Sequence, residues 1–428
     1  MATIIPILKK HLVYLLIILA AGLGWSQNTE FIQFSGKVTD QKTKKALVFA
    51  TLSLDGTNVS TITNTEGEYL LKVPTSSENG SITVSFLGYT NENIPLSSLD
   101  RENGKIALNV SITELSGVNI SAPKDARGLF EEALKKRGEN YFSQQTVMTA
   151  FYRETIKKRK KNVSLSEAVV NIHKAPYGSI RKDKIELYKA RKSTDYTKLD
   201  TLALKLQGGP FNTLFVDLVK YPDYVFSEGS LDYYDFSFKG STQINNKLIY
   251  IIDFNQKPEV SDPLYRGTLY IDAEKKILTS AVYALNITDK NRAAALFVRK
   301  KPRDVKVWPT DVAYRVDYRE KAGRWYYGYS NVVLEFRVKW DNKLFSSPYR
   351  MNAEMAITDW RPNTSGEIPK AKDRLKQSII LSDEAIGFSD PQFWGEYNII
   401  EPEKSIESAI RKIQRQLKRT ARQGNSIP

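Results

Sequence analysis

The chain has 428 residues, of which 41% are hydrophobic and 11% aromatic, and its formal net charge is +15. This composition is typical of a globular protein with two or three cores, and it excludes an intrinsically disordered chain. The absence of cysteine excludes disulfides, Cys-ligated metals and thiol nucleophiles.

The first 26 residues have the pattern of a secretory signal peptide. Lys9 and Lys10 precede an apolar run over residues 12–25, and the small residue Ser26 follows it. The run is too short to span a bilayer comfortably. We therefore expect cleavage after Ser26 and an exported protein, in the periplasm or associated with the outer membrane. An uncleaved membrane anchor is the alternative; after signal removal we expect no transmembrane segment.

Residues 31–122 predict a small seven-stranded β-sandwich. Period-two alternation bounded by Gly, Asn, Asp and Ser is typical of half-buried strands. Four or more such strands at this spacing favour a sandwich. The clearest strands lie at residues 34–38, 50–54, 69–73 and 82–86, with later ones at 106–112 and 118–121.

This stretch resembles the carboxypeptidase-regulatory-like, transthyretin-like domain of Gram-negative envelope proteins. The resemblance is carried by Gly36-x-Val38-x-Asp40, by the run from Ala46 to Leu52, by Gly56-Thr57, by the run from Thr61 to Tyr69, and by Gly88-Tyr89. Ala46 replaces the usual Pro and Asn64 the usual Asp; Asn can still bond its own backbone in a turn. The domain also resembles the N-terminal extension of TonB-dependent outer-membrane transporters. The resemblance to this domain family implies a fold but no reaction.

Residues 123–145 predict a helical connector. Asp125 can cap a helix over residues 125–139, whose apolar stripe is formed by Leu129, Phe130, Ala133 and Leu134. Short helices are also predicted at residues 200–206 and 212–219, on either side of a Gly-Gly-Pro turn.

Residues 146–361 predict a large antiparallel β domain. We expect strands at residues 148–156, 163–172, 184–190, 233–238, 248–254, 267–271, 277–287, 312–320, 324–336 and 349–358. The hairpin at 267–278 resembles those of periplasmic lipoprotein-carrier half-barrels, in which a curved sheet wraps an apolar cavity. A generic antiparallel sheet is the alternative. The residues expected to line such a cavity are Tyr270, Tyr283, Tyr314, Phe336 and Trp340.

Residues 362–428 predict an extended clamp followed by a basic helix. The aromatic-bearing clamp at 390–402 is expected to lie across the sheet domain. The helix at 403–422 carries an isoleucine stripe among basic residues. It could lie on an anionic membrane, but docking on its own domain is the preferred interpretation.

The sequence lacks most of the side chains and motifs that common hydrolases use. Beyond the signal peptide the only histidine is His173, in a strand-like alternation, so zinc-peptidase chemistry lacks its ligands. No P-loop, G-x-G-x-x-G or G-x-S-x-G motif occurs. We therefore expect no catalytic, metal-binding or cofactor-binding residues, although candidate paired carboxylates such as Glu154, Glu167, Asp253 and Asp272 leave a glycan hydrolase open.

The first hypothesis is a non-enzymatic envelope protein, associated with outer-membrane transport or assembly. Its sandwich would be an interaction module, and its large β domain would bind a protein partner or an amphipathic ligand. Its net positive charge favours an anionic lipid or glycan surface; export argues against nucleic acid. The alternatives are a lipid or lipoprotein carrier and a carboxylate-based glycan hydrolase.

Overall fold

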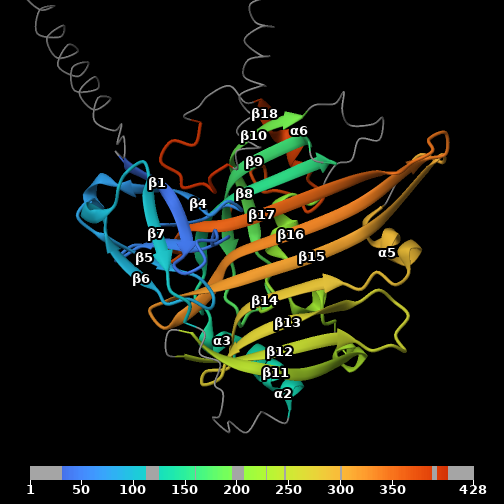
Figure 1. Ribbon diagram of the computed structural model, residues 1–428, viewed down its shortest axis with the longest axis horizontal. Coiled ribbons are helices and arrows are strands. Elements are labelled where there is room, and N and C mark those ends of the chain that lie inside the picture. The colour runs from blue at the N-terminus through green and yellow to red at the C-terminus, as the bar shows by residue number, and fades with distance from the viewer. Residues whose placement is uncertain are drawn as a thin grey trace, which may run out of the picture.

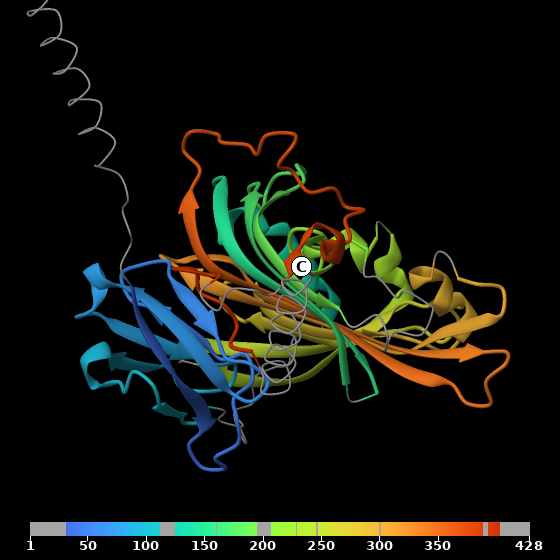
Figure 2. The same cartoon turned by 90° about the horizontal axis from the view of Figure 1, so that it is seen from above.

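The computed structural model describes residues 31–111, 125–159, 161–194, 207–227, 229–244, 247–298, 301–387 and 393–402. The predicted signal peptide, the strand at 118–121, and the helices at 200–206 and 403–422 lie outside these residues. The described part is mainly β: a small sandwich packs against one end of a long curved sheet (Figures 1 and 2). None of its helices combines the length and apolar character needed to cross a membrane.

The sandwich has seven strands among the described residues, as predicted. One sheet has the order β4-β1-β7 and the other β3-β2-β5-β6. The strands are β1 (Phe31–Asp40), β2 (Thr51–Leu54), β3 (Ser60–Ile62), β4 (Glu68–Pro74), β5 (Ser81–Ser85), β6 (Glu92–Pro95) and β7 (Gly104–Leu108), with the 3₁₀ turns η1 (Thr75–Ser77) and η2 (Leu96–Ser98). Their inward side chains, including Val38, Leu52 and Tyr69, form one buried core.

Two motif positions of the sandwich have a clear physical reason. β1 and β7 pair in parallel with Gly36 opposite Gly104, and a Cβ on Gly36 would lie 2.0 Å from the Gly104 carbonyl oxygen. Only a glycine allows this approach. Asn64 accepts hydrogen bonds from the N–H groups of Glu66 and Glu68, both at 2.9 Å, so it supplies the turn bonds expected of it.

The connector forms two helices, α2 (Ala126–Lys135) and α3 (Arg137–Asn140). The Asp125 carboxylate accepts a hydrogen bond from the Gly128 N–H at 2.7 Å, which confirms the predicted cap. The apolar stripe of α2 is buried against the large sheet through Leu129, Phe130 and Ala133.

The large sheet has eleven strands in the order β11-β12-β13-β14-β15-β16-β17-β8-β9-β10-β18. All ten predicted strands are present; only the two-residue β18 pairs in parallel, with β10. They are β8 (Thr146–Lys158), β9 (Lys161–Lys174), β10 (Lys184–Thr194), β11 (Tyr234–Ile244), β12 (Lys247–Gln256), β13 (Tyr265–Asp272), β14 (Ile277–Leu285), β15 (Val305–Lys321), β16 (Arg324–Trp340), β17 (Ser347–Pro362) and β18 (Ile386–Gly387).

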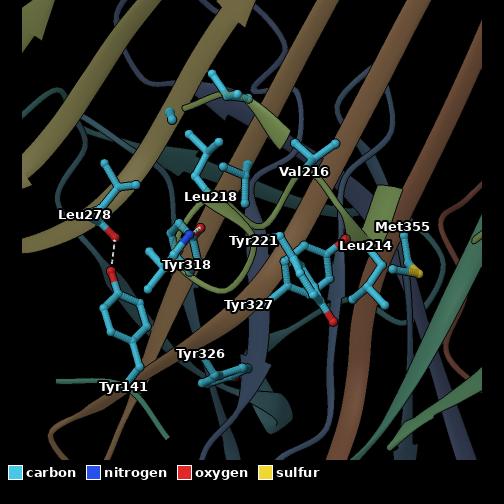
Figure 3. Packing of buried hydrophobic residues seen from close by; sticks show 14 of the residues in the cluster. Tyr141, Leu214, Val216, Leu218, Tyr221, Leu278, Tyr318, Tyr326, Tyr327 and Met355 are labelled. Carbon is cyan, nitrogen blue, oxygen red and sulfur yellow. Dashed lines mark hydrogen bonds between the residues drawn. The ribbon is translucent and has the colours of Figure 1, made fainter. Parts of the chain in front are cut away.

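One face of this sheet is filled by apolar side chains from helices and turns. The fillers are α2, α4 (Pro210–Leu214) and the turns after it, which include η3 (Pro222–Tyr224) and η4 (Ser230–Tyr233). Figure 3 shows Leu214, Val216 and Leu218 of this segment among Tyr318 and Tyr327 of the sheet. A second cluster covers the far end of the same sheet with α5 (Lys290–Phe297). A short helix α6 (Leu381–Glu384) contacts β9 and β10.

A buried ion network fixes the segment that follows α4. Lys174 Nζ lies 2.7 Å from an Asp183 oxygen and 2.9 Å from an Asp217 oxygen. The Tyr318 hydroxyl donates to Asp217 at 2.9 Å, and that of Tyr177 donates at 3.2 Å. Since buried charges are costly unless paired and hydrogen-bonded, this arrangement ties the segment after α4 to β9 and β15.

Candidate functional site

The sandwich and the large sheet meet along β3. The Ser60 hydroxyl donates to the Ile357 carbonyl of β17 at 3.1 Å, and the Asn58 amide donates to the Trp360 carbonyl at 2.8 Å. Arg319 of β15 donates to the Ser60 hydroxyl at 2.7 Å. An apolar cluster supports these bonds and contains Ile62, Phe151, Val169, Tyr329, Ala356, Phe393, Trp394, Ile399 and Ile400. The two units are therefore joined by both polar and apolar contacts.

Residues 393–402 lie between the sandwich and the sheet, as the red segment in Figure 2 shows. The side-chain amide of Asn398 accepts a hydrogen bond from the Lys72 N–H at 2.7 Å and donates to the Lys72 carbonyl at 3.1 Å. Thr61 donates to the Ile399 carbonyl at 3.0 Å, and Arg153 to the Ile400 carbonyl at 2.6 Å. This segment, which we call the clamp, thus bonds to both units.

A groove of about 580 Å³ opens beside this contact, between the outer face of β2 and β5 and the strands β12, β14, β15 and β16. The sandwich wall is rich in hydroxyl groups, which come from Thr51, Ser53, Thr83 and Ser85. These residues alternate with the buried core positions of their strands. The sheet wall instead carries charged and aromatic side chains, namely Lys247, Arg315, Asp317, Arg319, Glu320, Lys321, Trp325 and Tyr326. We call this site the interdomain groove.

The carboxylates of the interdomain groove are all engaged within the protein. Asp55 accepts hydrogen bonds from Ser81, Thr83 and Asn93 at 2.6–2.7 Å. Asp317 pairs with Arg315 at 2.7 Å, and Glu320 pairs with Lys247 at 2.7 Å. The Lys247 ammonium also lies 5.6 Å from the centre of the Trp325 ring. The walls therefore hold ordered polar groups at fixed positions.

Arg319 contributes a positive charge to the floor of the groove. Its stem lies across Gly328, where an added Cβ would come within 2.6 Å of the arginine Cγ. Its Nη2 atom is buried and has no hydrogen-bond partner among the described residues. Burial lowers the pKa of Arg319, and the neighbouring Tyr326 and Asp317 offset this effect only in part.

A second groove of about 390 Å³ lies between the sandwich, the clamp and the strands β8, β9 and β17. Its lining includes Lys72, Asp359, Trp360 and Glu396. Burial lowers the pKa of Lys72 to about 8 and raises the pKa of Asp359 above its usual range. Glu396, Tyr397 and Asn398 of the clamp form one of its walls.

The five predicted cavity residues lie in neither groove. Tyr283 and Tyr314 stack with ring centres 4.9 Å apart, inside the filled face of the sheet. Phe336 and Trp340 belong to the second cluster beside α5. Tyr270 is half-buried on β13 and packs in neither of these clusters. A cavity lined by the five together stays a prediction.

The other residues considered from the sequence have local partners. Glu167 lies between Arg153 and Arg191, at 2.7 and 2.8 Å, and Asp272 accepts two N–H groups of its own turn. His173 is buried in β9, with ring nitrogens 3.3 Å from the Glu367 carbonyl oxygen and 3.4 Å from a Glu186 carboxylate.

Glu154 points to the opposite face of the sheet from Glu167, because the register places Glu154 opposite Ser166 and Arg153 opposite Glu167. Burial raises the pKa of Glu154 to about 7, despite a hydrogen bond from Tyr152 at 2.8 Å. The two acids therefore do not converge on one cleft.

The sequence did not reveal the interdomain groove, whose two walls lie more than 150 residues apart in the chain. One feature of the sequence does indicate this surface: every outward position of β2 and β5 is Thr or Ser. A solvent-facing strand would ordinarily carry Lys or Glu as well. A continuous hydroxyl face of this kind indicates a surface that meets other polar groups.

Comparison with known proteins identifies the sandwich. No curated protein matches the chain. Solved structures that it resembles include a DUF1329 family protein from Desulfovibrio piger, at 11% identity over 56% of this chain and 95% of that chain, with a TM-score of 0.22. A LolA superfamily protein from Nitrosomonas europaea follows at 9% identity over 58% and 98% of the two chains, with a TM-score of 0.18. TM-scores this low do not establish a common fold. Residues 34–120 match the family model of the CarboxypepD_reg-like domain, and the N-terminal sandwich is a member of that domain family.

Proposed function

We propose that this protein is a non-enzymatic, exported envelope protein that holds a polar partner in the interdomain groove. The observation that carries the proposal is the groove itself, with one wall from the CarboxypepD_reg-like domain and the other from the large sheet. Its volume of about 580 Å³ falls in the range of ligand sites. Because the contact along β3 and the clamp fix the two walls, the site is preorganised.

The chemistry of the lining favours a polar partner over an acyl chain. Hydroxyls on one wall and paired charges on the other offer hydrogen bonds, and Trp325 adds a flat apolar surface to the sheet wall. A lipid or lipoprotein carrier would need an apolar cavity on the face of the sheet that holds Tyr283 and Tyr314. That face is occupied by α2, α4 and the turns after α4, which supports the carrier alternative less well.

The engagement of the acids favours binding over hydrolysis. A glycosidase needs two carboxyl groups facing each other across a cleft, whereas Asp55, Asp317 and Glu320 already accept hydrogen bonds from neighbouring side chains. Glu167 and Glu354 do converge, on Arg153, but both are buried and line neither groove.

Export is supported by the leader pattern of the first 26 residues. The resemblance of the sandwich to envelope proteins points the same way. Together these features support a protein of the periplasm or the outer membrane.

The test compares what copurifies with the full chain from its native envelope. Ser85→Trp would fill the groove from the sandwich wall, while Glu102→Trp adds the same side chain to an exposed turn of the same domain. We expect mass spectrometry to find one polar molecule or peptide segment with the wild type and Glu102→Trp, reduced about tenfold or more with Ser85→Trp. Equal recovery from both variants, or recovery of a glycan that the wild type shortens, would contradict the proposal.

A further inference from the structure

The hairpin between β16 and β17 ends in an exposed apolar pair. Leu344 and Phe345 are adjacent in the turn and are 81% and 78% exposed. Figure 1 shows this hairpin extending from the large sheet at the end farthest from the sandwich. Single exposed apolar side chains are common, but two neighbouring ones at the tip of a projecting hairpin need a reason.

Next to this tip, one face of four neighbouring strands carries a basic patch. The buried residues Val305, Phe336, Val338 and Tyr349 fix which positions face the core, so the alternate positions face outward. These outward positions are Lys306 on β15, Arg337 and Lys339 on β16, Arg350 on β17 and Lys157 on β8. Two acids adjoin them in the described register: Glu335, which pairs with Arg350 at 3.0 Å, and Asp311, which lies opposite Glu335 on β15. Arg159 and Lys161 lie at the adjacent turn between β8 and β9.

Within the patch, like charges face each other across strands. Lys306 lies directly opposite Lys339, and Lys157 lies directly opposite Arg350. The Lys306–Lys339 pair disfavours the sheet, whereas Arg350 is paired with Glu335. An anionic surface would turn this unfavourable arrangement into an attractive one, because every cation of the patch faces the same way.

We propose that this end of the sheet docks the protein on an anionic phospholipid membrane, with Leu344 and Phe345 entering the interface and the basic patch facing the headgroups. Stable peripheral binding generally needs two signals, and this site supplies both a hydrophobic one and an electrostatic one. An acidic protein or glycan would account for the patch but not for the apolar tip. The net charge of +15 acts in the same direction. This inference is independent of the interdomain groove, which lies beside the sandwich at the other end.

The electrostatic half of the proposal is tested by charge reversal with a matched control. Lys306→Glu/Lys339→Glu reverses the cross-strand pair of the patch. Lys37→Glu/Lys105→Glu reverses another exposed cross-strand lysine pair, in β1 and β7 of the sandwich, with the same change in net charge. All proteins keep the full chain, so that both termini contribute equally.

Binding is measured by cosedimentation with vesicles of phosphatidylcholine containing 30% phosphatidylglycerol, a composition chosen for the assay, and with pure phosphatidylcholine. We expect the wild type to bind the anionic vesicles, with partitioning that falls at high salt. Each removed cation should lower partitioning about fivefold. The patch reversal should therefore lose about 25-fold or more, while the sandwich control stays within about twofold of the wild type.

The apolar half is tested by Leu344→Ser/Phe345→Ser against Ile180→Ser/Ile368→Ser, which removes two exposed apolar side chains elsewhere. We expect the tip variant to bind anionic vesicles about tenfold more weakly and the control to bind like the wild type. Absence of wild-type binding, equal loss in test and control variants, or binding to heparin beads without binding to vesicles would overturn the proposal. Recovery of the groove partner should be unchanged in the patch variant, which separates this proposal from the proposed function.

Discussion

Arg153 of β8 and Glu167 of β9 lie opposite each other on paired strands and form an ion pair of 2.7 Å, with both side chains at most 1% exposed. Arg191 approaches the second oxygen of Glu167 at 2.8 Å. Arg153 also donates to the Ile400 carbonyl, and the Arg191 guanidinium lies 4.8 Å from the ring of Trp394. The pair therefore connects the sheet to the clamp.

Replacing Glu167 by Gln should destabilise the protein strongly. Burial alone would raise the pKa of Glu167, but the two arginines hold it below its usual range. The carboxylate therefore stabilises the fold fully above a pH of about 4.3, and this contribution is lost as the pH falls through the lower folded pKa. At pH 7 we expect Glu167→Gln to cost about 3–5 kcal/mol in urea unfolding, because two buried guanidinium groups lose their counterion.

The control for that variant is Glu335→Gln, which breaks the exposed pair with Arg350. Pairs of this kind contribute about 0–1 kcal/mol. Similar losses in the two variants would mean that the buried pair has no special role.

Glu154 should make the protein less stable as the pH rises. Burial raises its pKa to about 7 from an ordinary value of 4.5, so between these values the folded state binds more protons than the unfolded state. The free energy of unfolding therefore falls by about 3 kcal/mol in total between about pH 4.5 and pH 7, and it is constant above pH 7. We expect Glu154→Gln to be more stable than the wild type at pH 8 but not at pH 4.5, as measured by urea unfolding. A variant with the same pH profile as the wild type would refute this assignment.

Gly36→Ala should destabilise the sandwich. The added Cβ would lie 2.0 Å from the Gly104 carbonyl oxygen, so β1 and β7 would have to move apart. We expect a loss of about 2 kcal/mol or more in thermal or urea unfolding. Gly240→Ala in β11 is the control, since an added Cβ there meets no atom within 4 Å. The prediction fails if the two alanine variants unfold alike.

Asn398→Ala should loosen the clamp at the edge of the sandwich. The substitution leaves the N–H and the carbonyl of Lys72 without their partners, at a cost of about 1–3 kcal/mol. We expect faster hydrogen exchange in β4, measured by mass spectrometry, with no change after Asn342→Ala in an exposed turn. Unchanged exchange in β4 would show that the clamp does not hold this edge.

Much of the secondary structure could be predicted because alternation and turn residues are local signals. All ten long strands of the large sheet and the cap at Asp125 were predicted in this way. The short strands β3 and β6 were not, since the three residues of β3 give no period and β6 has a single large apolar residue, Ile94, and no buried position. Yet β3 makes the contact that positions both grooves, so the most consequential element of the sandwich was the least visible one.

The site could not be predicted because it depends on pairing between distant parts of the chain. The aromatic residues Tyr283 and Tyr314 indicated a lined cavity, but aromatic side chains on a sheet fit a filled core equally well, and here they stack in it. The interdomain groove instead joins Thr83 of the sandwich to Trp325 of the sheet. Nothing in either local pattern indicates that the two strands face each other.

The position of β8 has a consequence for how the molecule is made. This first strand of the large sheet lies between β9 and the last long strand, β17. A growing chain therefore keeps one edge of β8 open until some 200 further residues have been synthesised, and open strand edges invite pairing with other chains. Such distant pairing folds slowly. A chain that ended before β17 would keep that edge exposed, and the cell's quality-control proteases could recognise it as unfinished.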